Sequence, residues 1–158
     1  MKTHKKQTHN PLRPSAVRMN MIAACGINCA LCIGHHRDKR QCPGCRQMDT
    51  DKPNYCRKCV IRTCPQILNS RSGFCFECTD FPCKRIRNLD KRYRQNYGVS
   101  IVDNLLYIKT HGKQSFIRKE KAKWTCPQCG SLFSMHREIC LTCTAQNKWK
   151  GQYSGEKT

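Results

Sequence analysis

Helical periodicity of apolar residues is confined to one part of the chain, residues 84–123. Four apolar or aromatic residues recur there every three or four positions and share one helical face: Ile86, Leu89, Tyr93 and Tyr97. This spacing predicts an amphipathic helix, with Asp80 as its cap, entered through Pro82, and Gly98 as its end.

Two more helices are expected after this one. Ser100 and Asp103 have the spacing of a capping box in front of "IVDNLLYIKTHG", and Gly112 is suited to end that helix. Ser115 is a candidate start for a short third helix, "FIRKEKAK". Because twelve of the fifteen charged residues of this segment are Lys or Arg, the faces that point away from the core are expected to be cationic.

Residues 21–83 lack such periodicity and carry eleven of the fifteen cysteines. They contain an internal repeat, because "YCRKCVIRTCPQI" (55–67) and "FCFECTDFPCKRI" (74–86) align at a shift of 19 residues. The aligned positions are Tyr55 with Phe74, Cys56 with Cys75, Cys59 with Cys78, Cys64 with Cys83 and Ile67 with Ile86. We interpret the repeat as two similar cysteine knuckles that could face each other.

A compact unit follows at residues 124–143, "WTCPQCGSLFSMHREICLTC". It has two Cys-x2-Cys pairs, and Cys-Pro-x-Cys-Gly is typical of a zinc knuckle, because the glycine permits the tight turn that aims backbone amides at the thiolates. Four thiolates make a closed, structural zinc ribbon. His136 is a possible substitute ligand, although an outward or supporting position is favoured.

The chain therefore divides into five segments: a basic arm at 1–20 that we expect to be disordered, a cysteine-rich metal-binding region at 21–83, a basic helical segment at 84–123, a zinc ribbon at 124–145 and a polar tail at 146–158. We expect a small metal-stabilised α+β fold, with an irregular multi-zinc region, a short helical segment and the C-terminal ribbon.

Composition favours metal over disulfides as the source of stability. The 38% hydrophobic fraction includes the cysteines and the mean hydropathy is −0.73. The apolar core is therefore small, and the fold needs cross-links from disulfides or metal ions. No apolar stretch is long enough to cross a membrane, and no apolar h-region follows the basic N-terminus. We therefore expect a cytoplasmic protein without a membrane partner, whose thiols stay reduced and bind metal.

All fifteen cysteines are candidate metal ligands: Cys25, Cys29, Cys32, Cys42, Cys45, Cys56, Cys59, Cys64, Cys75, Cys78, Cys83, Cys126, Cys129, Cys140 and Cys143. Six Cys-x2-Cys pairs make three tetrahedral sites, and the three remaining thiols with His35 or His36 would complete a fourth. We expect three to four Zn²⁺ ions. Which pairs share an ion, and whether either histidine is a ligand or a polar loop residue, stays open.

An iron–sulfur cluster within residues 25–83 is the alternative cofactor, because Cys-x2-Cys with a nearby third thiol also suits four irons. The spacing of Cys25, Cys29 and Cys32 is also that of radical-SAM enzymes. The chain is too short for their barrel and lacks alternating strands and helices, which argues against that class.

The net charge of +20, from 30 Lys and Arg against 10 Asp and Glu, points to a polyanionic partner. The candidate contacts lie in the helical segment: Lys84, Arg85, Arg87, Lys91, Arg92, Arg94, Lys119, Lys121 and Lys123. Tyr93, Tyr97, Tyr107 and Trp124 could stack on bases, although Tyr93 and Tyr97 are better explained as core residues of the apolar stripe.

Five stretches together resemble a bacterial and archaeal cysteine-rich family, domain of unknown function 3795: "MIAACGINCALC", "CPGC", "FCFECTDFPCKRI", "RYRQNYGVSIVDNLLYIKTHG" and "WTCPQCGSLFSMHREICLTC". The resemblance covers about residues 21–145, and the ribbon corresponds to longer members. It implies a metal-bound fold and the cysteine ligands, but no substrate.

The function we expect is binding of nucleic acid, RNA or a ribonucleoprotein such as the ribosome, through the phosphate backbone. The alternatives are an iron–sulfur or zinc-thiolate enzyme or redox protein, and a zinc-shaped adaptor that docks on an acidic protein. Paired carboxylates, a phosphate-cradling glycine loop and a thioredoxin-like context are missing from the sequence, which argues against the enzyme.

Overall fold

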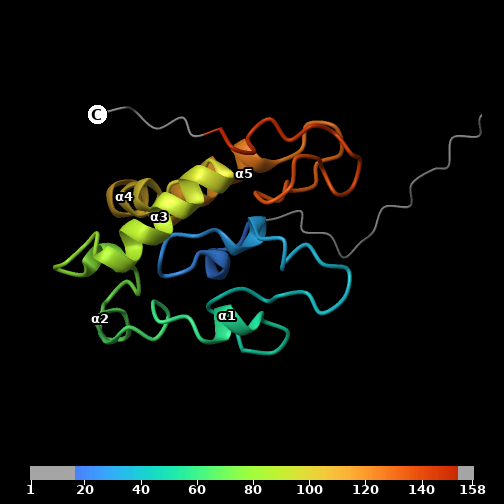
Figure 1. Cartoon of the computed structure of the whole chain (residues 1–158). Coiled ribbons are helices and arrows are strands. Elements are labelled where there is room, and N and C mark those ends of the chain that lie inside the picture. Colours follow the sequence, from blue (N-terminus) through green and yellow to red (C-terminus); the bar gives the residue numbers. More distant parts are fainter. Residues whose placement is uncertain (1–16, 153–158) are drawn as a thin grey trace, which may run out of the picture.

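The computed structural model describes residues 17–152. Most of the basic arm expected at residues 1–20 and the end of the polar tail, residues 153–158, lie outside the described residues. The three longer helices and the C-terminal ribbon form one side of the molecule, and the cysteine-rich loops form the other (Figure 1).

Helix α3 (Lys84–Tyr97) is the longest, and its apolar stripe packs against the core as predicted. It ends where Gly98 adopts a left-handed conformation (φ 67°), which confirms the predicted end. The predicted cap at Asp80 is wrong. The amide of Phe81 donates to the carbonyl of Cys78, so the chain is still turning at this point and the helix begins only after Cys83.

Helix α4 (Ile101–His111) packs against both α3 and α5 (Lys113–Trp124). The hydroxyl of Ser100 accepts a hydrogen bond from the Asp103 amide (3.1 Å), which confirms the N-terminal cap, and α4 stops at Gly112 as predicted. Helix α5 starts two residues before Ser115, because the amide of Phe116 already bonds to the carbonyl of Gly112.

The cysteine-rich region contains only short elements: the 3-10 turns η1 (Met19–Met21), η2 (Cys29–Leu31) and η3 (Cys75–Glu77), and the helices α1 (Asn54–Arg57) and α2 (Pro65–Leu68). Residues 17–152 form no strand, only isolated bridges such as Ile22 with Asn28. The β component of the expected α+β fold is therefore wrong. The chain turns at its cysteines too often to build a hydrogen-bonded ladder, and the structure is mostly helical.

The segment 22–33 connects the parts of the molecule. Its backbone carbonyls accept hydrogen bonds from three distant elements: Ala24 from the Cys75 amide, Gly26 from the Asn104 side chain and Leu31 from the Met135 amide. The core built around this segment includes Ile22, Leu31, Phe116, Trp124, Phe133 and Met135, all at most 2% exposed. Because these residues come from both sides of the molecule, one continuous core links the cysteine-rich loops to the helices and the ribbon.

No helix in the described part of the chain is both long and apolar enough to cross a membrane.

Candidate metal centre

Two matching loops present the four cysteines of the C-terminal ribbon. In the first, the Cys126 amide donates to the Ser131 carbonyl and the Gly130 amide to the Cys126 carbonyl. The second loop repeats both bonds fourteen residues later, with Cys140, Ala145 and Thr144 as the matching residues. Gly130 and Thr144 both have positive φ angles, 76° and 64°. The two knuckles therefore share one backbone conformation.

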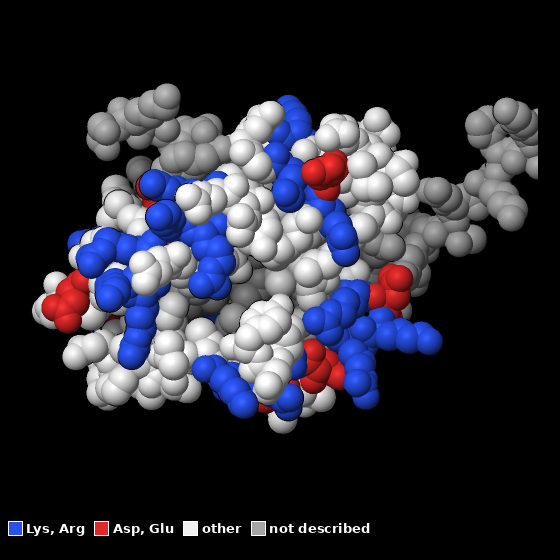
Figure 2. Space-filling model, viewed as in Figure 1, with Lys and Arg blue, Asp and Glu red and all other residues white. Residues whose placement is uncertain are grey.

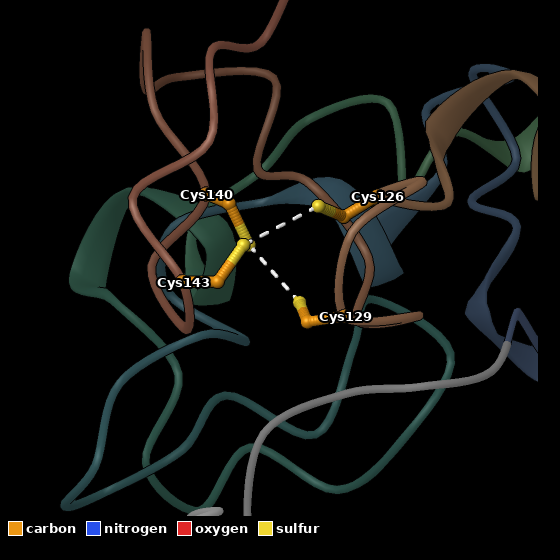
Figure 3. A group of neighbouring side chains, drawn as sticks. All are labelled: Cys126, Cys129, Cys140 and Cys143. Atoms are coloured by element: carbon orange, nitrogen blue, oxygen red, sulfur yellow. Dashed lines mark hydrogen bonds between the residues drawn. The ribbon is translucent and has the colours of Figure 1, made fainter. Parts of the chain in front are cut away.

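The four sulfurs of the ribbon converge on one point (Figure 3). The Sγ atoms of Cys126 and Cys143 are 3.6 Å apart, as are those of Cys129 and Cys140, and all four lie within 4.8 Å of one another. Tetrahedral zinc with Zn–S bonds of about 2.3 Å places its sulfurs about 3.8 Å apart. The quartet can hold a metal ion, and its geometry is consistent with zinc.

The thiols of the ribbon differ in how readily they lose a proton. Burial raises the pKa of Cys129, but hydrogen bonds from Ser131 and the neighbouring thiols outweigh it and lower the pKa to about 7. Burial, opposed by the Ala145 amide and assisted by the other thiols, raises the pKa of Cys143 to about 12. Because a metal ion binds the thiolate form of cysteine, metal binding to the ribbon must release the tightly held proton of Cys143.

His136 supports the ribbon from outside the sulfur quartet. Its Nδ1 accepts a hydrogen bond from the Ile33 amide (3.2 Å), and its ring packs edge-on against Tyr97. Burial, with Lys150 and Arg137 nearby, lowers the pKa of His136 to about 4, so the ring is neutral at physiological pH. This supporting position is the one that the sequence favoured.

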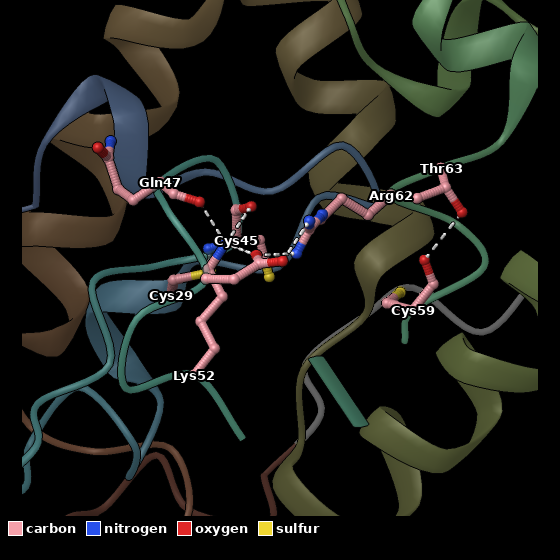
Figure 4. Close-up of polar contacts among 8 residues, drawn as sticks. Cys29, Cys45, Gln47, Lys52, Cys59, Arg62 and Thr63 are labelled. Atoms are coloured by element: carbon pink, nitrogen blue, oxygen red, sulfur yellow. Dashed lines mark hydrogen bonds and ion pairs between the residues drawn. The ribbon is translucent and has the colours of Figure 1, made fainter. Parts of the chain in front are cut away.

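Cys45 is the centre of a second group of thiols, in the cysteine-rich region. Hydrogen bonds from the thiols of Cys29 and Cys56 lower the pKa of Cys45 to about 3. The side chain of Lys52 is fully buried beside this group and donates to the backbone carbonyls of Cys45 and Gln47 (Figure 4). A buried ammonium group next to thiols favours the thiolate form.

A third group of thiols lines a cavity of about 40 Å³ between α2, η3 and the start of α3: Cys64, Cys75, Cys78 and Cys83. Burial, and then the thiols of Cys83, Cys64 and Cys78, raise the pKa of Cys75 to about 12. The internal repeat is visible here, because Cys64 and Cys83 both precede a helix and Ile67 and Ile86 are both buried.

Neither histidine near the first cysteines completes a four-ligand group. The Nδ1 atom of His35 bonds to the Cys42 carbonyl (2.7 Å) and the Nε2 atom of His36 to the Ala30 carbonyl (2.8 Å). Within residues 17–152, the ribbon quartet is the single group of three or more His, Cys, Asp or Glu ligand atoms that all lie within 4.8 Å. The expectation of three to four zinc ions therefore stays a prediction beyond this one site.

The candidate nucleic-acid contacts lie on α3 and α5. Eight of the nine are exposed: Lys84, Arg85, Arg87, Lys91, Arg92, Arg94, Lys119 and Lys121. Lys123 is half-buried, with its ammonium group over the rings of Trp124 and Trp149. Figure 2 shows Lys and Arg side chains gathered over the region of α3, with few carboxylates among them.

Sequence reasoning missed two buried polar contacts. Lys52 and Glu120 look like surface residues in the sequence, yet both are 5% exposed. The only sequence signal for Glu120 is its position four residues after Phe116, on the apolar face of α5. The residues 146–152, assigned to the polar tail, instead continue the ribbon, since Gln146 bridges to Ile139 and Asn147 is 2% exposed.

These observations define a cysteine-rich, mostly helical protein with a four-cysteine ribbon that can hold a metal ion. Residues 21–88 match the family described as "Protein of unknown function (DUF3795)", the family that the resemblance indicated. The ribbon lies beyond the matched residues, where the longer form of the family was expected to carry it. Neither the curated proteins nor the solved structures contain a match to this chain.

Proposed function

We propose that this protein binds RNA through its phosphate backbone, and that a zinc ion in the ribbon has a structural role. Four thiolates leave zinc no open coordination position for a reaction. The observation that carries the proposal is the surface of α3, which presents six cationic side chains and a single, buried carboxylate, Asp90.

The cations of α3 are arranged as a stripe. Four of them recur every three or four residues along one face: Lys84, Arg87, Lys91 and Arg94. At a rise of 1.5 Å per residue, this stripe spans about 15 Å along the helix. Arg87, Lys91 and Arg94 also line a groove of about 500 Å³ beside the start of α4, where Asp90 and Asp103 form part of the wall. A phosphate backbone can follow such a stripe without any contact to its bases.

Within residues 17–152, the charge on this face is neutralised only at Arg94, whose Nε lies 3.4 Å from Asp90 Oδ2. The other carboxylate oxygen of Asp90, Oδ1, accepts hydrogen bonds from the Ser100 hydroxyl (2.8 Å) and the Val102 amide (3.1 Å). Among the residues that the structure describes, no carboxylate forms an ion pair with Lys91 or Arg92. These cations are therefore available to a polyanion.

Aromatic stacking does not support the proposal. Tyr97 packs on His136, Tyr107 packs on His111 and Phe116, and Trp124 is 1% exposed. With these rings committed to intramolecular contacts, binding depends on charge and is expected to be independent of RNA sequence.

The test is the salt dependence of binding to a labelled single-stranded RNA, measured by fluorescence anisotropy. The variant Lys91→Gln/Arg92→Gln removes two adjacent cations from α3. The matched control, Arg57→Gln/Lys58→Gln, removes two exposed cations at the C-terminal end of α1. We expect the α3 variant to bind more weakly and to reduce the slope of log K against log salt by about 1.4. The control should keep the wild-type slope.

Equal weakening in both variants would mean that net charge, not the α3 face, attracts RNA. A pull-down from lysate with and without nuclease addresses the adaptor alternative. Partners that persist after nuclease treatment, together with no RNA binding by the purified chain, would overturn the proposal in favour of an acidic protein partner.

A further inference from the structure

The thiol-lined cavity between α2, η3 and α3 differs from the ribbon in the distances between its sulfurs. A single tetrahedral ion needs its ligand atoms as close together as those of Cys126, Cys129, Cys140 and Cys143. Within the described part of the chain, no three ligand atoms outside the ribbon lie mutually within 4.8 Å. The four cavity thiols are therefore too far apart to close around one ion.

The cavity that these thiols line has room for more than a single small ligand. Its volume of about 40 Å³ exceeds the 10–15 Å³ that a single water requires. Four thiols that line one cavity of this size suit a polynuclear cluster, in which each thiolate binds a different iron and inorganic sulfide bridges the irons.

The wall of the cavity suits such a cluster. Apart from the thiols, it is formed largely by apolar side chains, Ile61, Ile67, Phe81 and Ile86, which restrict the access of water. Cys83 is the N-cap residue of α3, a helix of 14 residues, and its side chain makes no capping hydrogen bond. The helix dipole therefore favours negative charge on this sulfur.

The four cavity thiols come from both copies of the internal repeat. Cys75, Cys78 and Cys83 all belong to the second copy, and Cys64 comes from the first copy. Helix α2, which follows Cys64, packs against η3, which holds Cys75. In two-cluster ferredoxins, too, a cysteine of one repeat completes the site of the other.

We propose that Cys64, Cys75, Cys78 and Cys83 bind a four-iron iron–sulfur cluster, separate from the zinc ion of the ribbon. Each of the four thiols releases its proton to solvent and forms one Fe–S bond. The proposal is independent of RNA binding, and its readouts are iron, sulfide and visible absorption.

The experiment is anaerobic reconstitution of the full-length, zinc-loaded chain with ferrous iron, ferric iron and sulfide under a thiol reductant. We compare Cys75→Ser with Cys56→Ser, because these cysteines occupy equivalent positions of the repeat but only Cys75 lines the cavity. Wild type and Cys56→Ser should become brown, and Cys75→Ser should take up about four fewer iron atoms per chain than wild type. Ribbon zinc, measured in each sample, reports whether the variant has folded.

Three results would overturn the proposal. Wild type could retain zinc in place of iron and remain colourless, in which case the cavity binds a different metal. Cys75→Ser could keep the full iron content. Reduced wild type could also lack the electron paramagnetic resonance signal of a four-iron cluster. If Cys75→Ser loses its ribbon zinc, and so has not folded, Cys78→Ser takes its place as the variant.

Discussion

The side-chain amide of Asn28 donates a hydrogen bond of 3.1 Å to the carboxylate of Glu120, and this contact joins two residues that are 92 positions apart. Asn28 lies in the segment that connects the parts of the molecule, and Glu120 lies on α5. Both side chains are buried, at 1% and 5% exposure. Burial raises the pKa of Glu120, although the hydrogen bond from Asn28 and the nearby Lys123 and Lys119 oppose the shift.

Glu120→Gln should therefore stabilise the protein at neutral pH. The folded protein holds a proton on Glu120 more tightly than the unfolded chain does, so stability falls as pH rises from the ordinary glutamate pKa through the raised one. Above that window the cost of the buried charge is fully present. Glutamine keeps an acceptor for Asn28 without the charge. The measurement is the free energy of unfolding of both proteins across a pH series.

The gain from Glu120→Gln should shrink as pH falls and disappear near the ordinary glutamate pKa, about 4.3. Since zinc release at low pH affects both proteins alike, the difference between them isolates Glu120. A variant less stable than wild type at neutral pH would show that the carboxylate is favourable in its buried position.

Gly26→Ala should destabilise the contact between the connecting segment and α4. Gly26 has a φ of 86°, and a β-carbon there would lie 2.8 Å from Leu105 Cγ and 2.9 Å from the Ile101 carbonyl. Gly151→Ala is the matched control, because Gly151 also has a positive φ (74°) but nothing within 4 Å. We expect Gly26→Ala to cost about 1–3 kcal/mol more than the control in denaturant melts. Equal costs would mean that α4 shifts to make room.

Thr144→Gly should stabilise the second knuckle of the ribbon. Thr144 has a φ of 64° at the position where the first knuckle has Gly130. Glycine relieves the strain of the left-handed conformation, but it also gives the unfolded chain more conformational freedom. The net effect should be a gain of about 0.5–1 kcal/mol in the free energy of unfolding, measured in thermal melts of the zinc-loaded protein. Thr142→Gly, which lacks a positive φ, should give no gain. A loss with Thr144→Gly would indicate that its hydroxyl stabilises the knuckle.

Removal of a single ribbon ligand should release the metal. Cys140→Ser is expected to lose one zinc ion per chain by elemental analysis, and residues 124–152 should lose their protection from hydrogen exchange, because structural zinc supplies about 10–16 kcal/mol of binding free energy. Gln128→Ala, an exposed residue between two ligands, should keep the ion. Full chelation under reducing conditions should unfold the chain, and a cooperative melt after chelation would contradict this dependence on metal.

Local patterns in the sequence were sufficient to predict the ribbon and most of the helix ends. The Cys-x2-Cys pairs at 126–129 and 140–143 are close in sequence, so their turn geometry places the sulfurs together with little help from the rest of the chain. The ends of α3 and α4 at Gly98 and Gly112 likewise depend on backbone conformations that glycine adopts most readily. Asp80 was misassigned because a turn at Cys78 competes with the helix start.

The cysteine pairs, the internal repeat, the cationic helices and the family match of residues 21–88 could all be read from local sequence patterns. Which thiols outside the ribbon line a common cavity, and the contact between Asn28 and Glu120 in the core, could be seen only in the folded protein. Spacing along the chain fixes the geometry of a turn, whereas the pairing of distant groups depends on how the whole core packs around segment 22–33.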